Sequence, residues 1–281
     1  DGDYYRLLTE YHQERLRLSR EIGHRPVEAD ALMDCGQIQA IYLGDYDGGL
    51  ALLDESARIW EGTPSEAFVL LRIAQVRALQ GRHSDALEAV ERAQRIVDER
   101  AVYALAYAGV RLVEAMLCNA IGELRNYDRA LELWEETRQL VVDAPLTRQY
   151  EMAAACEGAA AHLGIAQLLA DETDRQAHRQ QALELSQSAL DIYQQSGFVQ
   201  IIECVSEEIL FRHSRALAAN GRVEESLHYV RRAYDEMMRK HNLIPADSPF
   251  RHTYLENIDL HCEIRAAVES RAAVGENERC Q

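Results

Sequence analysis

The stretch that decides the fold is GDYDGGLALLDESARIW, from Gly44 to Trp60. It begins with a cluster of glycine, aspartate and tyrosine that breaks helices, and it continues as an amphipathic run with apolar residues at helical spacing. Glycine permits a tight reversal of the backbone at such a break. The stretch therefore predicts the hinge and the second helix of a helix–turn–helix unit.

The same hinge recurs along the chain, first as Gly2-Asp3-Tyr4 at the start of the sequence. A small or apolar pair follows three and four positions after each hinge, and another small residue commonly comes seven positions later. Small residues let crossing helices approach closely, so the repetition predicts stacked helix pairs. The hinge positions are Tyr4, Tyr46, His83, Tyr127, Arg179 and Val223, and the crossing positions include Gly49, Ala86, Ala130, Ala182 and Ser226.

Composition and periodicity both indicate an all-α chain. The sequence has 281 residues, of which 47% are hydrophobic and only five are proline, and good helix formers dominate it. Between the breaks, apolar residues recur with helical spacing, and convincing strand alternation is absent. We therefore predict an all-α, right-handed superhelical solenoid of five to six helix pairs, in which each pair buries its apolar face against its neighbours.

The formal net charge of −17 argues against two classes of partner. Binding to nucleic acid and to anionic membrane surfaces both depend on clustered lysine and arginine, so neither is expected. The 30 basic residues include a single lysine, Lys240. No apolar stretch reaches the length of a bilayer span and no signal peptide is visible, so we expect a cytoplasmic protein.

Motifs that carry chemistry are missing from the sequence. It contains no phosphate-binding G-x-x-x-x-G-K-[ST], no H-E-x-x-H and no G-x-S-x-G. The six cysteines are far apart, as expected for buried thiols in a reducing compartment, and the ten histidines lack zinc spacing. The adjacent Glu207 and Glu208 are predicted to lie on a solvated helix face. We expect no catalytic residue, no metal site, no cofactor and no enzymatic activity.

The repeated units resemble the tetratricopeptide repeats, in which a Gly-Asp-Tyr-type turn is followed by alanine at the helix crossing. Gly44 onward, and Gly81 with Ala86 and Ala93, carry the resemblance most clearly. The spacing between the hinges is longer than usual for the family. In this respect the chain is similar to the longer-helix arrays of signal-transduction ATPases and MalT-like regulators. The resemblance implies repeats at 30–63, 67–100, 111–144, 149–196 and 207–240, where the fourth carries an insertion at Asp171–His178.

The two ends of the chain are interpreted by the same resemblance. Residues 1–26 are expected to be the second helix of a truncated repeat, which implies a fragment of a larger bacterial regulatory or signalling protein. The alternative is a helical protein that starts with an unpaired capping helix. Residues 249–273 are expected to form one C-terminal capping helix with a polar outer face. Residues 274–281 are expected to be a disordered tail.

In this family the first helix of each unit lines a concave groove, which the resemblance carries over as the candidate binding surface. Asparagine suits bidentate hydrogen bonding to a peptide backbone, and arginine suits pairing with carboxylates. These residues are expected to matter for a partner and not for folding. The alternatives are a solvated face with pairs inside one helix, or a convex site at Arg138, Arg231 and Arg232. The candidate groove residues are Phe68, Arg72, Gln75, Asn119, Phe211, Arg212 and Arg215.

Two functions follow as expectations. The first is a non-catalytic module that binds a protein or peptide partner in the concave groove. The alternative is a ligand-sensing module that controls an attached signal-transduction ATPase or transcriptional regulator, in which case the nucleotide-binding domain lies outside this chain.

Overall fold

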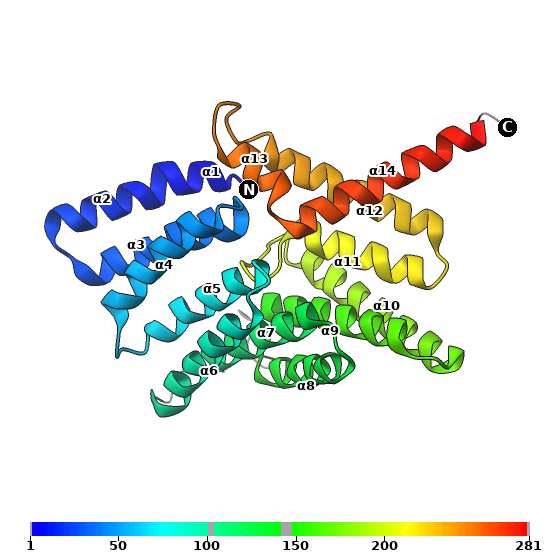
Figure 1. Cartoon of the computed structure of the whole chain (residues 1–281), viewed down its shortest axis with the longest axis horizontal. Coiled ribbons are helices and arrows are strands. Elements are labelled where there is room, and N and C mark those ends of the chain that lie inside the picture. Colours follow the sequence, from blue (N-terminus) through cyan, green and yellow to red (C-terminus); the bar gives the residue numbers. More distant parts are fainter. Residues whose placement is uncertain (1, 101–103, 142–147, 280–281) are drawn as a thin grey trace.

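The computed structural model describes residues 2–100, 104–141 and 148–279, and every regular element among them is a helix (Figure 1). The repeat boundary predicted at 144 and the tail residues 280 and 281 lie outside these ranges. None of the helices in the described ranges combines the length and the apolar composition that a membrane crossing needs. The elements are α1 (Tyr4–Arg6), the π-helical η1 (Leu7–His12), α2 (Gln13–Ile22), α3 (Arg25–Gln37), the π-helical η2 (Ile38–Tyr42), α4 (Tyr46–Trp60), α5 (Glu66–Leu79), α6 (His83–Arg100), α7 (Ala104–Ile121), α8 (Leu124–Val141), α9 (Arg148–Leu168), α10 (Glu172–Gln195), α11 (Ser206–Ala219), α12 (Val223–His241), α13 (Phe250–Glu256) and α14 (Asp259–Arg279).

Neighbouring helices pack as antiparallel pairs, and each pair stacks on the next (Figure 1). The pairs are α3 with α4, α5 with α6, α7 with α8, α9 with α10 and α11 with α12. At the N-terminal end, α1, η1 and α2 run on as one helix that packs on α3. This arrangement confirms the predicted all-α helical solenoid.

The small residues at the helix crossings are buried. Ala86, Ala130 and Ala182 have no exposed surface. Gly49 lies so close to the preceding helix that an added Cβ would stand 2.6 Å from the carbonyl oxygen of Gly36. Two glycines facing each other therefore let α3 and α4 cross more closely than an alanine would allow.

Enlarging a crossing residue is expected to destabilise the solenoid. Leucine at Ala86 or Ala130 adds three heavy atoms where no space is left, which typically costs about 1–3 kcal/mol. Urea unfolding of Ala86→Leu and Ala130→Leu measures this cost. Midpoints equal to the wild-type value in both variants would contradict the assigned crossings.

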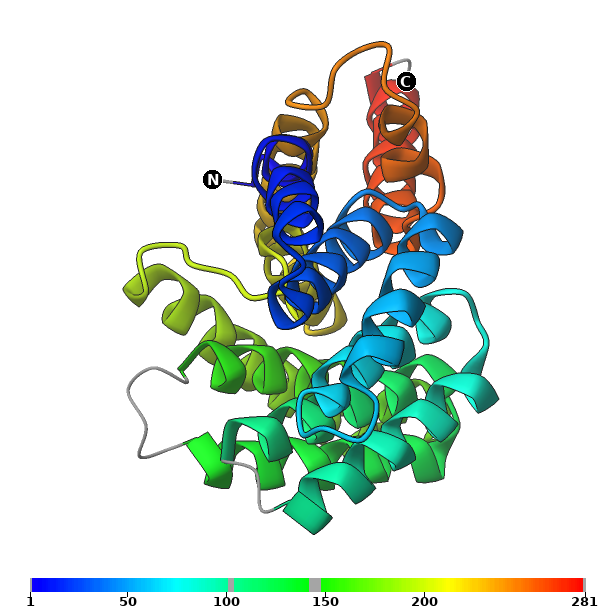
Figure 2. The same ribbon diagram turned by 90° about the vertical axis from the view of Figure 1, so that its left-hand side faces the viewer.

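The first and last units of the solenoid meet, so the array closes on itself (Figures 1 and 2). The hydroxyl of Tyr46 donates to the carbonyl of Asn257 at 2.8 Å, and the amide of Asn257 donates to the carbonyl of Gly44 at 2.9 Å. The hydroxyl of Thr253 donates to the carbonyl of Leu43 at 2.5 Å. The hinge at 43–46 is thus held by Thr253 of α13 and by Asn257, which lies between α13 and α14.

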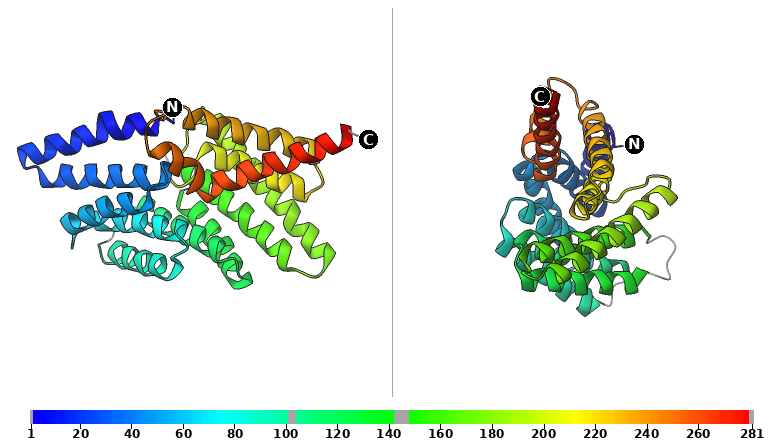
Figure 3. Two further views of the ribbon diagram at one scale, coloured as in Figure 1. Left: turned by 45° about the horizontal axis from the view of Figure 1, so that its top comes forward. Right: turned by 90° about the vertical axis from the view of Figure 1, so that its right-hand side faces the viewer.

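This closure corrects the expectation of one capping helix over 249–273. The segment is two helices, α13 and α14, interrupted at Asn257, whose side chain bonds the carbonyl of Gly44. The second helix also extends to Arg279, into the segment 274–281 that was expected to be disordered. As Figure 3 shows, α14 lies alongside α12.

The expected insertion at Asp171–His178 is also helical. Asp171 caps α10, and its carboxylate accepts from the backbone N–H groups of Thr173 and Asp174. The helix therefore begins at Glu172, and the extra residues lengthen α10 by two turns rather than forming a loop.

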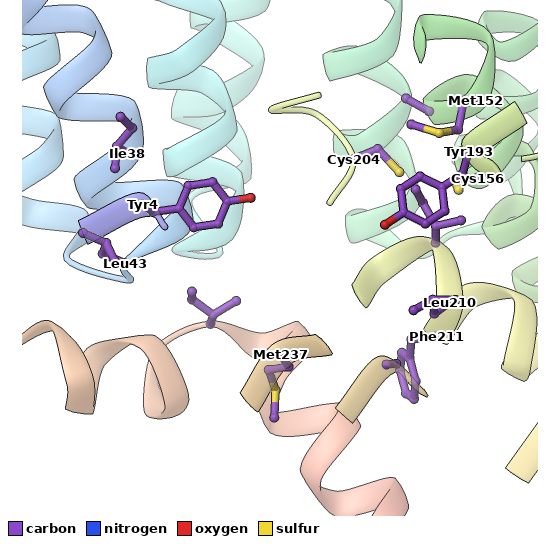
Figure 4. Packing of buried hydrophobic residues seen from close by; sticks show 14 of the residues in the cluster. Tyr4, Ile38, Leu43, Met152, Cys156, Tyr193, Cys204, Leu210, Phe211 and Met237 are labelled. Carbon is purple, nitrogen blue, oxygen red and sulfur yellow. The ribbon is translucent and has the colours of Figure 1, made fainter. Parts of the chain in front are cut away.

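A single large apolar core joins the two ends of the chain. It contains Tyr4 and Leu43 from the first units, Met152 and Phe211 from later units, and Tyr254 from α13, all of them buried. Figure 4 shows side chains of this core, among them Tyr4, Leu43, Met152 and Phe211. This core therefore fills much of the interior of the solenoid, and its side chains shape the space that is left.

Candidate functional site

An inner cavity of about 530 Å³ lies on the inside of the solenoid. Its wall comes from the first helices of four successive units, α5, α7, α9 and α11, and from the beginning of α14. Because the first and last units meet beside it, the cavity is bounded by elements from both ends of the chain.

Five of the seven candidate groove residues line this inner cavity. Two do not. Phe68 is partly buried against the apolar cluster of the second and third units, and Arg72 lies behind the cavity wall. The five that the structure brings together are Gln75, Asn119, Phe211, Arg212 and Arg215.

Arg72 is a buried structural residue. Its guanidinium donates to Glu203 at 2.5 Å and to the side-chain oxygen of Gln75 at 2.9 Å. Glu203 sits in the segment between α10 and α11, and its side chain is only 2% exposed. The pair therefore ties α5 to a segment 131 residues further along the chain.

Arg212 lies between two carboxylates at the cavity wall. Its guanidinium donates to Glu208 at 2.8 Å and to Glu157 at 3.0 Å. Asn119 also donates to Glu157, at 2.6 Å. Burial raises the pKa of the Glu208 carboxyl; Arg212 counteracts this, and the neighbouring Glu157 adds to it. Arg212 thus holds α9 and α11 together, contrary to the expectation that it has no role in folding.

A second ionic cluster was missed by the sequence reasoning. Lys240 on α12 pairs with Glu207 on α11, and both side chains are almost fully buried. The other oxygen of Glu207 lies 3.3 Å from Nε2 of His261, whose Nδ1 faces the carbonyl of Tyr254 at 2.7 Å. The ring of Tyr4 covers the ammonium group at 5.5 Å. This cluster joins α1 to the last four helices, α11 to α14.

Glu207 and Glu208 were expected on a solvated face, and this is wrong. Both belong to α11, which lies between the cavity and the helices α9 and α12, so both of its sides are covered. Burial raises the pKa of Glu207, but the charge of Lys240 and the contacts with His261 outweigh it, so its pKa is lowered well below the usual value.

The remaining arginines are closer to solvent. Arg215 is half exposed and pairs with Glu263 at 3.2 Å across the cavity mouth. On the convex side, Arg138 pairs with Glu135, and Arg232 stands 5.1 Å from the ring of Tyr229. The half-exposed Arg215 is the candidate arginine that is least restrained by the fold.

Comparison with known proteins finds similarity among solved structures alone. No protein-family model matches the chain, and no curated protein matches it. Among solved structures, the crystal structure of BtubC (BKLC) from P. vanneervenii is similar, with a TM-score of 0.49 and 15% sequence identity. The similarity covers 88% of this chain and 96% of that one. No residue role follows from a likeness at this level.

Proposed function

We propose that this chain is a non-catalytic binding module of the tetratricopeptide type, which takes a short segment of a protein or peptide partner in its inner cavity. The observation that carries the proposal is the convergence of four successive first helices on one cavity. Its volume of about 530 Å³ falls in the range of pockets for small ligands, roughly 300–1,000 Å³. Such a space fits a few residues of an extended peptide rather than a folded domain.

The tetratricopeptide assignment rests on the hinge glycines and the buried crossing residues. Gly44, Gly81 and Gly221 all have positive φ at the hinges, and Ala86 and Ala130 are fully buried at the crossings. The cysteines at 35, 118, 156, 204 and 262 are unpaired, which supports a reducing, cytoplasmic setting.

A sensor role is the second candidate, and the closure of the solenoid favours it. The contacts of Asn257 with Gly44 and Tyr46 lie beside the cavity. A ligand that fits only the closed array, or only the open one, would therefore shift the equilibrium between the closed and the open array. In this role the chain regulates an attached signal-transduction ATPase or transcriptional regulator.

Filling the inner cavity is expected to abolish binding without unfolding the chain. Ala160 on α9 lines the cavity and is only partly buried, so leucine at this position projects into free space. A synthetic tripeptide library is incubated with the wild-type chain and with Ala160→Leu, and the retained peptides are identified by mass spectrometry. Retention should fall at least tenfold in the variant.

Ala218→Leu is the matched control, because Ala218 lies on the exposed side of α11 and away from the cavity lining. This variant should retain the same peptides as the wild type, and both variants should keep the wild-type melting temperature. If the wild-type chain retains no peptide, or if Ala160→Leu retains as much as Ala218→Leu, the cavity is not the binding site.

A further inference from the structure

The chemistry of the inner cavity indicates which ligands it accepts, an inference that rests on the proposed function. Carboxylates outnumber arginines on its lining. Two arginines line it, Arg212 and Arg215. The carboxylates that line it are Glu157, Glu203, Glu207, Glu208, Asp259 and Glu263.

Asp259 and Glu263 are exposed, and among the buried or partly buried carboxylates of the lining the excess of negative charge is located at one place in the wall. Glu203 has Arg72 as its own partner, and Glu207 has Lys240. Glu157 and Glu208, by contrast, share the one guanidinium of Arg212.

The two carboxylates that share Arg212 are well buried. The side chain of Glu157 is 3% exposed and that of Glu208 is 14% exposed. Charges removed from water need compensation by opposite charge and by hydrogen bonds, so a pair of carboxylates with one cation is short of positive charge.

An unused hydrogen-bond acceptor lies at the same place. The amide nitrogen of Asn119 donates to both the backbone carbonyl and the carboxylate of Glu157, which fixes the orientation of the amide. Its oxygen, Oδ1, is buried, and among the described residues nothing donates to it. A buried acceptor without a donor costs free energy, and its partial negative charge adds to that of the carboxylates at this place in the wall.

The rest of the lining is suited to hydrocarbon. Apolar side chains from three first helices face the same space as the carboxylates. They give a ligand with an alkyl stem a surface that excludes water. These apolar residues are Val113, Met116, Leu163 and Phe211.

We propose that the inner cavity binds an alkylammonium group, whose cationic end lies beside the carboxylates of Glu208 and Glu157 and whose stem lies against the apolar wall. An ammonium group offers three donors and no acceptor, which suits a wall that presents carboxylate acceptors. Two sources carry this chemistry: the side chain of a lysine in a peptide partner, and a free aliphatic diamine.

The test is calorimetric titration of the whole chain with two cationic probes, 1,5-diaminopentane and the tripeptide acetyl-Ala-Lys-Ala-amide. Their neutral analogues are 1,5-pentanediol and acetyl-Ala-norleucine-Ala-amide. At least one cation should bind at least tenfold more tightly than its neutral analogue. Binding of the diamine alone identifies a free amine as the ligand, and tighter binding of the tripeptide identifies a lysine side chain. If neither cation binds more tightly than its neutral analogue, the proposal is overturned.

Glu208→Gln tests the place of contact. The substitution removes the surplus charge and leaves Arg212 paired with Glu157, so the fold is retained while cation binding weakens at least tenfold. Glu225→Gln is the control, because Glu225 pairs with Arg222 on the surface and makes the same change in net charge. Equal affinity of Glu208→Gln and wild type would overturn the proposal.

The outcomes also separate this inference from the proposed function. Neutral or anionic tripeptides could be retained by the wild type and lost in Ala160→Leu while the cations fail to bind. In that case the cavity is a peptide site and only the ligand class is wrong. If the cations bind equally well to Ala160→Leu, they bind outside the cavity and the proposal fails.

Discussion

Replacing Lys240 by methionine is expected to destabilise the chain by about 3–5 kcal/mol, since removing one partner of a buried ion pair leaves the other charge uncompensated. Lys240 and Glu207 are 1% and 2% exposed, and two other neighbours of the carboxylate, the hydroxyl of Ser206 at 3.1 Å and Nε2 of His261 at 3.3 Å, stand further away than the ammonium group. Methionine keeps a chain of four heavy atoms and lacks only the terminal nitrogen of lysine, so the loss chiefly reports the charge and not a cavity. Urea unfolding measures it.

The matched control is Arg222→Met, which removes a cation from an exposed pair with Glu225. Exposed pairs contribute about 0–1 kcal/mol, so this variant should unfold close to the wild type. The double variant Lys240→Met, Glu207→Gln should recover part of the loss, because the buried charge is then gone. A loss below 1 kcal/mol for Lys240→Met would show that Glu207 is not buried as a charge.

The pH dependence of the same pair has a definite sign. Because the pKa of Glu207 is lowered in the folded chain, its contribution to stability is complete above the usual carboxyl pKa of about 4.3. It is lost as the pH falls through the lowered value. In Lys240→Met the main cause of the lowering is gone and burial raises the pKa of Glu207, so the difference in unfolding free energy between the wild type and this variant should be largest near pH 7 and shrink as the pH falls.

Gly44→Ala is expected to have the second large effect, because it acts on the closure of the solenoid. Gly44 has a φ of 76°, where a non-glycine residue costs about 1–2 kcal/mol. In addition, its Cβ would overlap the backbone carbonyl of Thr253. Moving that backbone breaks the bonds of Thr253 and Asn257 to the hinge at 43–46. The total loss of unfolding free energy is then about 2–5 kcal/mol.

Comparison with Gly221→Ala separates the free energy lost through closure from the free energy lost through the backbone conformation. Gly221 has the same φ of 76° at the hinge between α11 and α12, but an added Cβ has no atom within 4 Å. This variant should show the backbone cost alone. Equal destabilisation of the two variants, measured by urea unfolding, would mean that the ends of the array do not pack on each other.

Local features of the sequence predict the helix pairs well. The hinge glycines and the small crossing residues act within one unit, so residues such as Ala86 are found by spacing alone, and all are buried as a close crossing requires. The glycine at position 49 departs from the alanine that the family prefers, and the structure explains it by the contact with Gly36.

The closure and the ionic interior were beyond local reasoning. Tyr46 and Asn257 are 211 residues apart, and Glu207 and Lys240 are 33 residues apart on different helices. A helical pattern tells which face of a helix is apolar but not which distant charge meets it. One signal was present: Lys240 is the single lysine among 30 basic residues, and it occupies a buried position that suits a compact ammonium group.

The candidate site was predicted in part. The first-helix positions of the family placed Gln75, Asn119 and Arg212 on the inside of the array, and the structure brings them to one cavity. Their partners were not foreseen, because Glu157 and Glu203 come from elements far along the chain. The arginines that were expected to meet a ligand's carboxylates already meet carboxylates of the chain itself.

The central claim is that the first and last units close around the inner cavity, and the single lysine gives a direct measurement of it. Lys240 lies under Tyr4 of the first helix, so a reagent that acylates amines reaches it only when the array opens. Mass spectrometry then follows modification at one site, with Arg222→Lys as an exposed reference. Lys240 should react at least a hundredfold more slowly than this reference in the wild type, and markedly faster in Gly44→Ala. Wild-type Lys240 reacting as fast as the reference would contradict the closed solenoid.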